Sequence, residues 1–323
     1  MSRTHLITGV AGQDGILLAR HLLAEGGRVI GTVRPGSDRS RAMAPYLDGV
    51  DVVEHDLRDI DGFVGLVADR RPDEIYNLAA MSSVGRSWDQ PEAAVAINGA
   101  APMKMLEVLA DFPDVRFLQA GSVEETAAAA DSPYARGKIQ AREATRAARE
   151  AGRFACTAVL HIHESVLRPP SFVSRKITRA AAEIAAGRAD SLTLGAIDVR
   201  RDWGAAADHV GAMRMILAAD TPGDYQVGTG VIHSLRDLVD VAFRAAGIDD
   251  PWPLVRHDGG LQRPSDSTEI VATPDRPAQD LGWRPRHTFE QTIAEMVRVD
   301  MVRLRTGVEE SLGYLHGSEV VAP

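Results

Sequence analysis

The chain has little of several features that define large classes of proteins. Its 323 residues include one cysteine, Cys156, which excludes an internal disulfide and a cysteine-rich zinc site. Acidic residues outnumber basic ones and the formal net charge is −9, so composition gives no reason to expect nucleic acid as a partner. By inspection, no apolar run reaches the roughly 18 residues that a membrane span requires. We therefore expect a cytoplasmic protein that binds neither membrane nor nucleic acid.

The remaining composition is that of an ordinary globular protein. Hydrophobic residues make up 45% of the chain and charged residues 25%, which allows one large domain or two joined domains. The N-terminal residues 1–5 run directly into an apolar strand and leave no room for a signal peptide. Because Cys156 lies in the apolar run 154–160, we predict a buried structural thiol rather than a nucleophile.

In the first half of the chain, short apolar runs alternate with longer helical patterns. The predicted strands are 6–8, 28–33, 52–54, 74–78, 115–120 and 155–160, and the predicted helices are 16–25, 60–69, 91–109 and 134–151. This alternation is typical of a doubly wound parallel sheet, so we predict an α/β Rossmann domain over residues 1–162. The pattern then becomes less regular, with helices near 172–186, 206–219, 234–246 and 289–305. We assign 163–310 mainly to a smaller substrate-binding region, with some chain returning to the Rossmann domain, and 311–323 to a flexible tail.

A glycine-rich turn follows the first predicted strand and opens the first helix. Gly9, Gly12 and Gly15 permit a tight turn, close approach of a pyrophosphate, and close packing of the helix on the strand. The helix N-terminus, which includes Gln13 and Asp14, offers N–H groups and the positive end of a dipole to phosphates. These features predict a dinucleotide site.

The residues after the second strand bear on the choice between NAD and NADP. A carboxylate there would bind the ribose 2′-hydroxyl and repel a 2′-phosphate, but this strand ends in Arg34, with Arg39 and Arg41 nearby. Guanidinium groups suit a phosphate dianion, so we predict NADP and assign its phosphate to Arg34. A solvated loop is an equally good interpretation of Arg39 and Arg41.

Small or acidic residues follow the next two strands. Asp56 and Leu57 come just after the third strand and are candidates for contact with the adenine edge. Ala79 and Ala80 follow the fourth strand, where small side chains let the backbone approach a cofactor. We add all four to the predicted cofactor site.

The candidate reaction centre follows the fifth strand. Tyr134 and Lys138 are four residues apart, so on a helix they project from one face, one turn apart. An ammonium beside a phenol favours the phenolate, which lets Tyr134 exchange a proton nearer neutral pH. Ser122 ends the preceding strand, at the edge where ligands bind, and is placed to hydrogen-bond a substrate hydroxyl. Glu124 adds a carboxylate suited to removing a carbon-bound proton or protonating a departing hydroxide.

These residues resemble a known family. From about His5 to Arg305, the chain is similar to the GDP-mannose 4,6-dehydratases, which are extended short-chain dehydrogenase/reductases. The main matching stretches are ITGVAGQDG at 7–15, RPDEIYNLAA at 71–80, SVGRSWDQP at 83–91, SPYARGK at 132–138, FVSRKITRA at 172–180 and RDWG at 201–204. The first of these and the RKITRA/RDWG pair separate this family from the nucleotide-sugar epimerases.

The resemblance implies a dehydration that uses NADP without net oxidation or reduction. Tyr134 would deprotonate the C4 hydroxyl of GDP-mannose while a hydride passes to NADP. Glu124 would then remove the C5 proton, water would leave from C6, and the hydride would return to C6. Ser122 stands where the family has threonine, and Lys138 stands at the family's lysine.

The resemblance also implies a substrate site and an assembly. It places Ser87 near the sugar. Positions that contact the GDP moiety in the family correspond to Lys176, Arg201 and Arg263, and Asp266 stands at a ribose-binding glutamate. The family forms dimers through a four-helix interface, so we expect a homodimer or homotetramer built on the helices near 91–109 and 134–151. We expect no metal, since His161 and His163 lack further ligands at a suitable spacing.

Departures from the family's pattern gather around the predicted sugar position. Ile162 replaces an amide, Val166 replaces a proline, and the segment 125–133 is shorter than the family's loop. Retained catalytic residues beside an altered sugar pocket leave the exact sugar open. Two alternatives also remain open: an NADPH-dependent 4-keto reductase or epimerase of a related nucleotide sugar, which a net consumption of NADPH would reveal, and an NADP-binding homologue without turnover.

Overall fold

The computed structural model describes residues 2–125, 131–261, 269–272 and 275–316. The chain divides into two compact units. The first unit comprises residues 1–161, 209–227 and 273–284, and the second unit comprises residues 162–208, 228–272 and 285–323. The first break lies beside position 162, the boundary that the sequence suggested, and two later segments return to the first unit.

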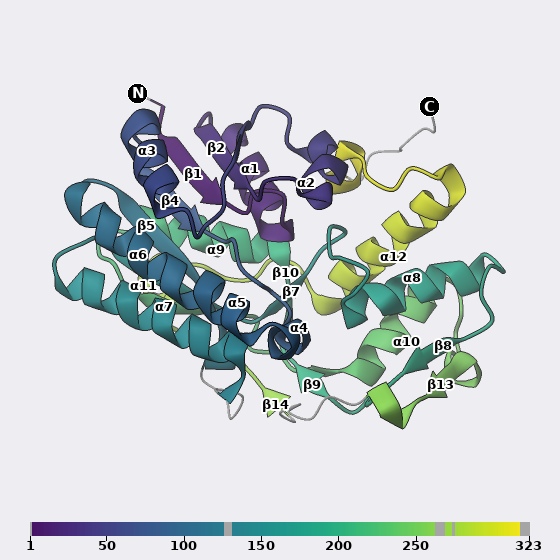
Figure 1. Cartoon of the computed structure of the whole chain (residues 1–323). Coiled ribbons are helices and arrows are strands. Elements are labelled where there is room, and N and C mark those ends of the chain that lie inside the picture. Colours follow the sequence, from purple (N-terminus) through teal and green to yellow (C-terminus); the bar gives the residue numbers. More distant parts are fainter. Residues whose placement is uncertain (1, 126–130, 262–268, 273–274, 317–323) are drawn as a thin grey trace. The chain divides into compact units, whose positions relative to one another are not determined.

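The first unit is built on a seven-stranded parallel sheet (Figure 1). The strands run in the order β11-β6-β5-β4-β1-β2-β3, and each neighbouring pair is parallel. Their bounds are β1 Thr4–Thr8, β2 Arg28–Val33, β3 Asp51–Glu54, β4 Glu74–Asn77, β5 Arg116–Ser122, β6 Ala155–Leu160 and β11 Asp224–Val227. The predicted doubly wound α/β fold is confirmed. Because the strand order reverses beside β1, the carboxyl ends of β1 and its neighbours border the crevice where such folds bind ligands.

Helices flank this sheet (Figure 1). They are α1 Gln13–Ala24, α2 Asp38–Ala42, α3 Ile60–Arg70, α4 Val84–Asp89, α5 Pro91–Val95, α6 Ala101–Val108, α7 Pro133–Glu150, most of α9 Ala206–Ala218, and α11 Asp275–Leu281. The start of α7 follows from its sequence, because Ser132 is the N-cap and Pro133 occupies the first turn. The hydroxyl of Ser132 accepts a hydrogen bond from the Ala135 N–H at 3.1 Å.

The strand β11 was not predicted from the sequence. It pairs with β6 from Asp224 opposite Thr157 to Val227 opposite Leu160. Only Tyr225 and Val227 are buried, so this edge strand of four residues has no continuous apolar run to reveal it.

The segment Pro91–Asp111 differs from its prediction. It is one helical stretch of 21 residues that includes a π-helical turn, Ala96–Ala100, between α5 and α6. Its most apolar window has a mean hydropathy of 1.2, so by length and composition the helix could cross a membrane. Inspection of the sequence had found no apolar run of that length. About 44% of that window is buried inside the protein, where α5 and α6 pack beside α7 (Figure 1).

Cys156 lies on β6 and is fully buried, which confirms the predicted structural thiol. Burial raises the pKa of this thiol to about 11, so it is protonated near neutral pH.

In its described residues, the second unit has small sheets and three α-helices that pack together. Its strands are β7 Ile162–Glu164, β8 Leu192–Leu194, β9 Arg200–Arg201, β10 Trp203–Ala205, β12 His233–Ser234, β13 Val255–His257 and β14 Glu269–Ile270. Its helices α8 Val173–Ala185, α10 Leu235–Ala245 and α12 Phe289–Thr306 pack against one another. Their core includes Ile177, Leu238, Phe243 and Ile293, each fully buried.

Part of the segment 311–323, predicted as a flexible tail, has regular structure. Residues Leu312–Leu315 form a short 3₁₀ helix, and Tyr314 is buried with its ring under the Arg303 guanidinium at 4.8 Å. A single aromatic residue that packs against α12 orders this segment, which the polar flanking sequence did not suggest. Residues 317–323 lie outside the described residues.

Candidate active site

A chain of buried polar side chains ties together the carboxyl ends of three strands. The Thr8 hydroxyl on β1 donates to Asn77 Oδ1 on β4 at 2.7 Å, and Asn77 Nδ2 donates to Gln119 Oε1 on β5 at 2.8 Å. Gln119 Nε2 then donates to the carbonyl oxygen of Ala120 at 2.9 Å. All three side chains are buried, so these bonds satisfy groups that would otherwise be costly inside the sheet. Sequence reasoning missed them, although polar residues inside apolar strands are the signal.

Lys138 connects the helix α7 to this chain. Its ammonium donates to the same carbonyl of Ala120 at 2.7 Å and lies 5.9 Å from the centre of the Tyr134 ring. Lys138 is 4% exposed, and burial lowers its pKa to about 8 although the charges of Glu125 and Asp14 raise it. Tyr134 is also buried, at 8% exposed. The predicted spacing of Tyr134 and Lys138 on one helical face is therefore what the structure has.

Ser122 and Glu124 lie in the tight turn that ends β5. Ser122 closes the strand and the 3₁₀ turn Val123–Glu125 follows, with the Ser122 hydroxyl accepting a hydrogen bond from the Glu124 N–H at 3.3 Å. Ser122 is 8% exposed and Glu124 is partly exposed. Since Lys138 is bonded to Ala120, two residues before Ser122, all four predicted catalytic residues come together at the carboxyl end of β5.

Ser87 lies on α4 and is fully buried. Its hydroxyl donates to the Val84 carbonyl at 2.7 Å and accepts from the Tyr134 N–H at 3.3 Å. Both bonds are made within the protein, and together they fix the backbone of Tyr134. The position of Ser87 near a sugar stays a prediction.

Asn98 is a site residue that the sequence reasoning missed. It lies in the π-helical turn, and its amide makes two bonds to the backbone of Met81: Oδ1 accepts from N–H at 2.8 Å and Nδ2 donates to C=O at 3.2 Å. Helix α7 comes very close here, since a Cβ on Gly137 would lie 2.8 Å from Asn98 Cβ. Asn98 thus fixes the loop after β4, which includes Ala79 and Ala80. An asparagine at the buried face of an apolar helix was the available signal.

The glycine-rich loop has the shape that a dinucleotide requires. Gly9 has a left-handed backbone with φ of 71°, and a Cβ there would lie 2.8 Å from Ala79 Cα. A Cβ on Gly15 would lie 2.5 Å from the Gly9 carbonyl oxygen. Gly12 is the N-cap of α1 and has no side chain to cap the helix. The backbone N–H groups of the first turn, which begins with Gln13 and Asp14, are therefore not capped by a side chain at this loop. These features fit a pyrophosphate at the N-terminus of α1.

Arginines after β2 differ in their surroundings. Arg34 is exposed, Arg41 forms an ion pair with Asp38, and Arg39 is partly buried with its Nε donating to the Ala11 carbonyl at 3.2 Å. The structure therefore brings Arg39 to the glycine-rich loop, whereas the sequence favoured Arg34.

Asp56 and Leu57 follow β3 as predicted. Hydrogen bonds from Arg58 lower the pKa of Asp56 to about 2, so its carboxylate is ionised and already paired. Leu57 is buried, at 8% exposed, within the apolar cluster around Phe63.

Lys176 and Arg201 lie in the second unit. Lys176 is on α8, with its ammonium bonded to the Thr193 carbonyl at 2.7 Å, and Arg201 is on the central strand β9 of the sheet β12-β9-β14 and is 7% exposed. The next residue, Asp202, accepts hydrogen bonds from the N–H groups of Thr229, Gly230 and Ala272 at 3.0, 2.8 and 3.3 Å. Arg263 and Asp266 lie outside the described residues. Within the described ranges, no group of three His, Cys, Asp or Glu side chains could hold a metal ion.

Comparison with known proteins decides the family. The family model for GDP-mannose 4,6 dehydratase matches residues 6–296. The chain belongs to the GDP-mannose 4,6-dehydratase family. It is 33% identical to the GDP-mannose 4,6-dehydratase of Vibrio cholerae over 99% of both chains, and 35% identical to that of Yersinia enterocolitica over 92% of this chain and 93% of the relative. The human GDP-mannose 4,6 dehydratase is 32% identical over 93% and 92% of the two chains.

Solved structures support the fold. The dTDP-glucose 4,6-dehydratase of Streptomyces venezuelae, with NAD and TYD bound, superposes with a TM-score of 0.82 at 22% identity, covering 94% of this chain and 98% of the other. RMD from Pseudomonas aeruginosa, complexed with NADPH, gives a TM-score of 0.76 at 21% identity, covering 94% and 99%. At these identities the likeness establishes the Rossmann fold of this dehydratase family member and no more.

Replacing Asn98 by Ala tests the role of its amide. The Met81 N–H and C=O would lose both partners, so we expect the free energy of unfolding in urea to fall by about 1–3 kcal/mol and dinucleotide binding to weaken. Asn98→Asp is the second variant: it keeps the acceptor for the Met81 N–H but places a buried carboxylate oxygen against the Met81 carbonyl, so near neutral pH it should be at least as destabilised as Asn98→Ala. Equal stability of all three proteins would contradict this role.

Proposed function

We propose that this protein catalyses the NADP-dependent dehydration of GDP-mannose to GDP-4-keto-6-deoxymannose. The observation that carries the proposal is the convergence of Ser122, Glu124, Tyr134 and Lys138 at the carboxyl end of β5, in a chain of this family. A simple dehydrogenase needs a hydroxyl, a phenol and an ammonium. The added carboxylate of Glu124 is what an elimination requires.

The cofactor proposal rests on the loop between β1 and α1 and on the arginines after β2. Gly9, Gly12 and Gly15 would admit the pyrophosphate, and Arg39, held at this loop by the Ala11 carbonyl, would join Arg34 at the 2′-phosphate of NADP. When bound, the nicotinamide takes up the hydride from C4 and returns it to C6. We assign Ala79 and Ala80 to the approach of the nicotinamide, since their side chains are small, and Asp56 and Leu57 to the adenine edge, since they follow β3.

Tyr134 and Lys138 carry the first proton transfer. Tyr134, as phenolate, takes the proton of the C4 hydroxyl, while the Lys138 ammonium favours the phenolate by its charge. Ser122 donates its hydroxyl hydrogen toward the oxygen at C4, because its lone pair already accepts the Glu124 N–H. The C4 ketone formed in this way acidifies the neighbouring C5 proton.

Glu124 carries the elimination. Its carboxylate removes the C5 proton and passes it to the hydroxide that leaves C6, so one water is released. C5 then regains a proton as hydride arrives at C6, and the proton held by Tyr134 is the one available for it. Atoms therefore balance with the loss of one water and no net change of the cofactor.

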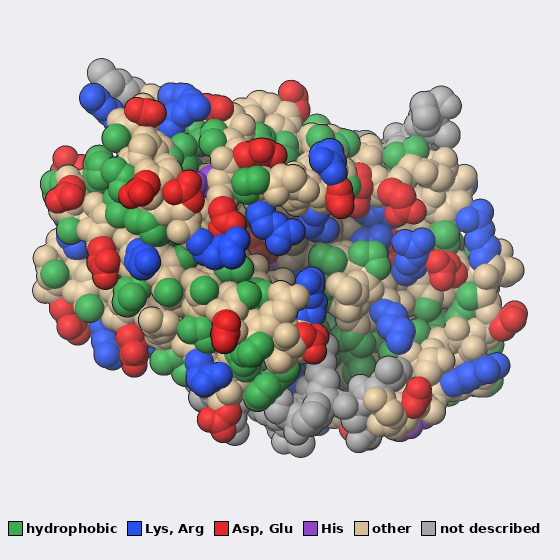
Figure 2. Space-filling model, viewed as in Figure 1, with side chains coloured by type: hydrophobic (Ala, Val, Ile, Leu, Met, Phe, Trp, Pro, Cys, Tyr) green, Lys and Arg blue, Asp and Glu red, His purple; other side chains and the backbone are tan. Residues whose placement is uncertain are grey.

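The nucleotide would bind to residues of the second unit. We propose that Lys176, Arg201 and Arg263 contact the GDP moiety and that Asp266 binds its ribose, since cations suit a diphosphate. Acidic and basic side chains alternate over the face drawn in Figure 2, which fits a local rather than a global attraction for an anion. GDP-sugars and NADP are intracellular metabolites, so we propose a cytoplasmic location.

Incubation of the purified protein with GDP-mannose and NADP, followed by mass spectrometry of the sugar nucleotide, tests the proposal. We expect loss of one water without accumulation of NADPH. Tyr134→Phe should lower turnover at least about a hundredfold because no base remains for the C4 hydroxyl, and should leave NADP binding intact. Net consumption of NADPH would indicate a reductase or epimerase instead, and unchanged turnover by Tyr134→Phe would exclude this mechanism.

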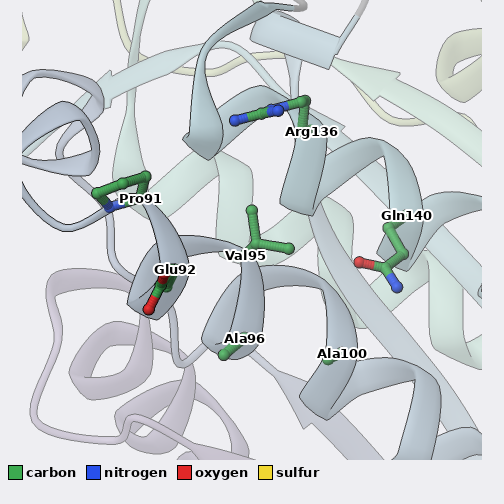
Figure 3. Close-up of a pocket in the computed structure, with 7 residues that line it drawn as sticks. All are labelled: Pro91, Glu92, Val95, Ala96, Ala100, Arg136 and Gln140. Atoms are coloured by element: carbon green, nitrogen blue, oxygen red, sulfur yellow. The ribbon is translucent and has the colours of Figure 1, made fainter.

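We also propose a homodimer built on the first unit. Figure 3 shows a shallow groove between α5, the π-helical turn and α7, lined by Pro91, Glu92, Val95, Ala96, Ala100, Arg136 and Gln140. The lining is largely apolar, and five of these seven residues belong to the helical stretch Pro91–Asp111, whose most apolar window is 44% buried. A second copy of the same helices would cover such a surface.

Ala96→Glu tests this interface, because it adds a charge to the apolar lining. We expect the molar mass from light scattering to fall to that of one chain of 34.7 kDa. Glu107→Gln, on an exposed position of α6, is the matched control and should leave the assembly unchanged. A wild-type protein that is monomeric at micromolar concentration would contradict the proposal.

A further inference from the structure

Glu125 is a buried carboxyl group at the reaction centre that the mechanism above does not use. Its side chain is 1% exposed, and Oε1 accepts a hydrogen bond from the backbone N–H of Ser122 at 2.6 Å. The other oxygen, Oε2, has no hydrogen-bond partner among the described residues. A buried carboxylate oxygen without a hydrogen bond raises the free energy of the folded protein, and an apolar side chain would fill the same space at lower cost.

The surroundings of Glu125 are charged and come from two elements. Helix α7 presents Lys138 and, one turn later, Arg142, whose Nη1 lies 3.8 Å from Glu125 Oε2. Strand β11 contributes Asp224, which pairs with Arg142 Nε at 3.5 Å and with Arg149 at 2.8 Å. Glu125 therefore lies between the lysine of the reaction centre and an ion-pair network farther along the same helix.

In the part of the chain that the structure describes, Lys138 has few other sources of negative charge. The groups that favour its ammonium are Glu125 and, to a smaller extent, Asp14 on α1. Its hydrogen bond goes to the neutral carbonyl of Ala120, and Tyr134 faces it from the preceding turn. Glu125 is thus the main anion that opposes the loss of the buried ammonium's proton.

We propose that Glu125 is a positioning residue of this site, which fixes Ser122 through its backbone and keeps Lys138 charged beside Tyr134. The S-V-E-E sequence at 122–125 makes this possible in one turn, because a glutamate three residues after a serine reaches back to the serine N–H as in a capping box. The two roles are separable, since the first needs an acceptor and the second needs a charge.

The sign of the charge effect follows from the two pKa values. Burial raises the pKa of Glu125 to about 7, although the Ser122 N–H, Lys138 and Arg142 lower it. The pKa of Lys138 is about 8. Glu125 is therefore ionised in the range where Lys138 begins to lose its proton. Removing the carboxylate should move that loss to lower pH and leave the behaviour below about pH 6.5 unchanged.

The composition offers a direct measurement of Lys138. The chain has three lysines, Lys104, Lys138 and Lys176, so protein labelled with ¹³C at the lysine ε-carbon gives few signals, and Lys138→Arg assigns the relevant one. We expect Glu125→Gln and Glu125→Leu to lower the midpoint of the Lys138 titration by about half a pH unit or more. Glu150→Gln, which removes a carboxylate from an exposed position of α7, is the matched control and should leave the midpoint unchanged.

Measurements of turnover distinguish the positioning role from the charge role. This test rests on the proposed function, whereas the lysine titration does not. Below about pH 6.5, Glu125→Gln should keep near wild-type kcat/KM because it keeps an acceptor for the Ser122 N–H. Glu125→Leu, folded by circular dichroism, should lose roughly tenfold or more. The alkaline limb of the pH profile of kcat/KM should move to lower pH in both variants. An unchanged Lys138 midpoint in both variants would overturn the charge role, and equal acid-side activity of the two would overturn the positioning role.

Discussion

The buried ammonium of Lys138 is the constraint on which the rest of this site depends. It is 4% exposed and has the carbonyl of Ala120 as its hydrogen-bond acceptor. Burial works against this charge, and the protein offsets it with a carbonyl fixed by Gln119 and with the nearby carboxylates of Glu125 and Asp14. A lysine held in this way keeps its charge close to a phenol. Its pKa of about 8 is close to neutral pH, so small changes in the surrounding charges change how much of the lysine is protonated.

The fold builds this arrangement from elements far apart in the sequence. The bonds from Thr8 through Asn77 to Gln119 align the ends of β1, β4 and β5. Close packing of α7 at Gly137 against the π-helical turn brings Asn98 to the loop after β4, and Ser87 fixes the backbone of Tyr134. The same edge of the sheet thus carries the cofactor loop, the loop after β4 and the proton-transfer groups. A hydride acceptor can therefore reach C4 while a proton acceptor reaches the hydroxyl on the same carbon.

The fold and the main chemistry could be predicted from the sequence because they depend on local patterns. Alternating apolar runs and helical periods gave the parallel sheet, and the spacing of Tyr134 and Lys138 gave one helical face. What could not be predicted depends on burial. From the sequence, Glu125 is one more acid in a polar loop, and only the structure shows that its side chain is buried beside Arg142 of α7. The bonds of the Ser87 hydroxyl to Val84 and Tyr134 likewise depend on packing that the sequence does not show. The strand β11 and the packing of Tyr314 were missed because each depends on a few side chains whose partners are distant.

The central claim is that one site removes a hydride from C4, holds the sugar through the loss of water, and returns the same hydride to C6. Turnover of GDP-mannose that carries deuterium at C4, followed by magnetic resonance of the product, measures this directly. The account predicts deuterium at C6 of the 4-keto-6-deoxy sugar, with none in the surrounding NADPH or solvent. Product without deuterium at C6 would contradict it, because the hydride would then have left the site between the two halves of the reaction.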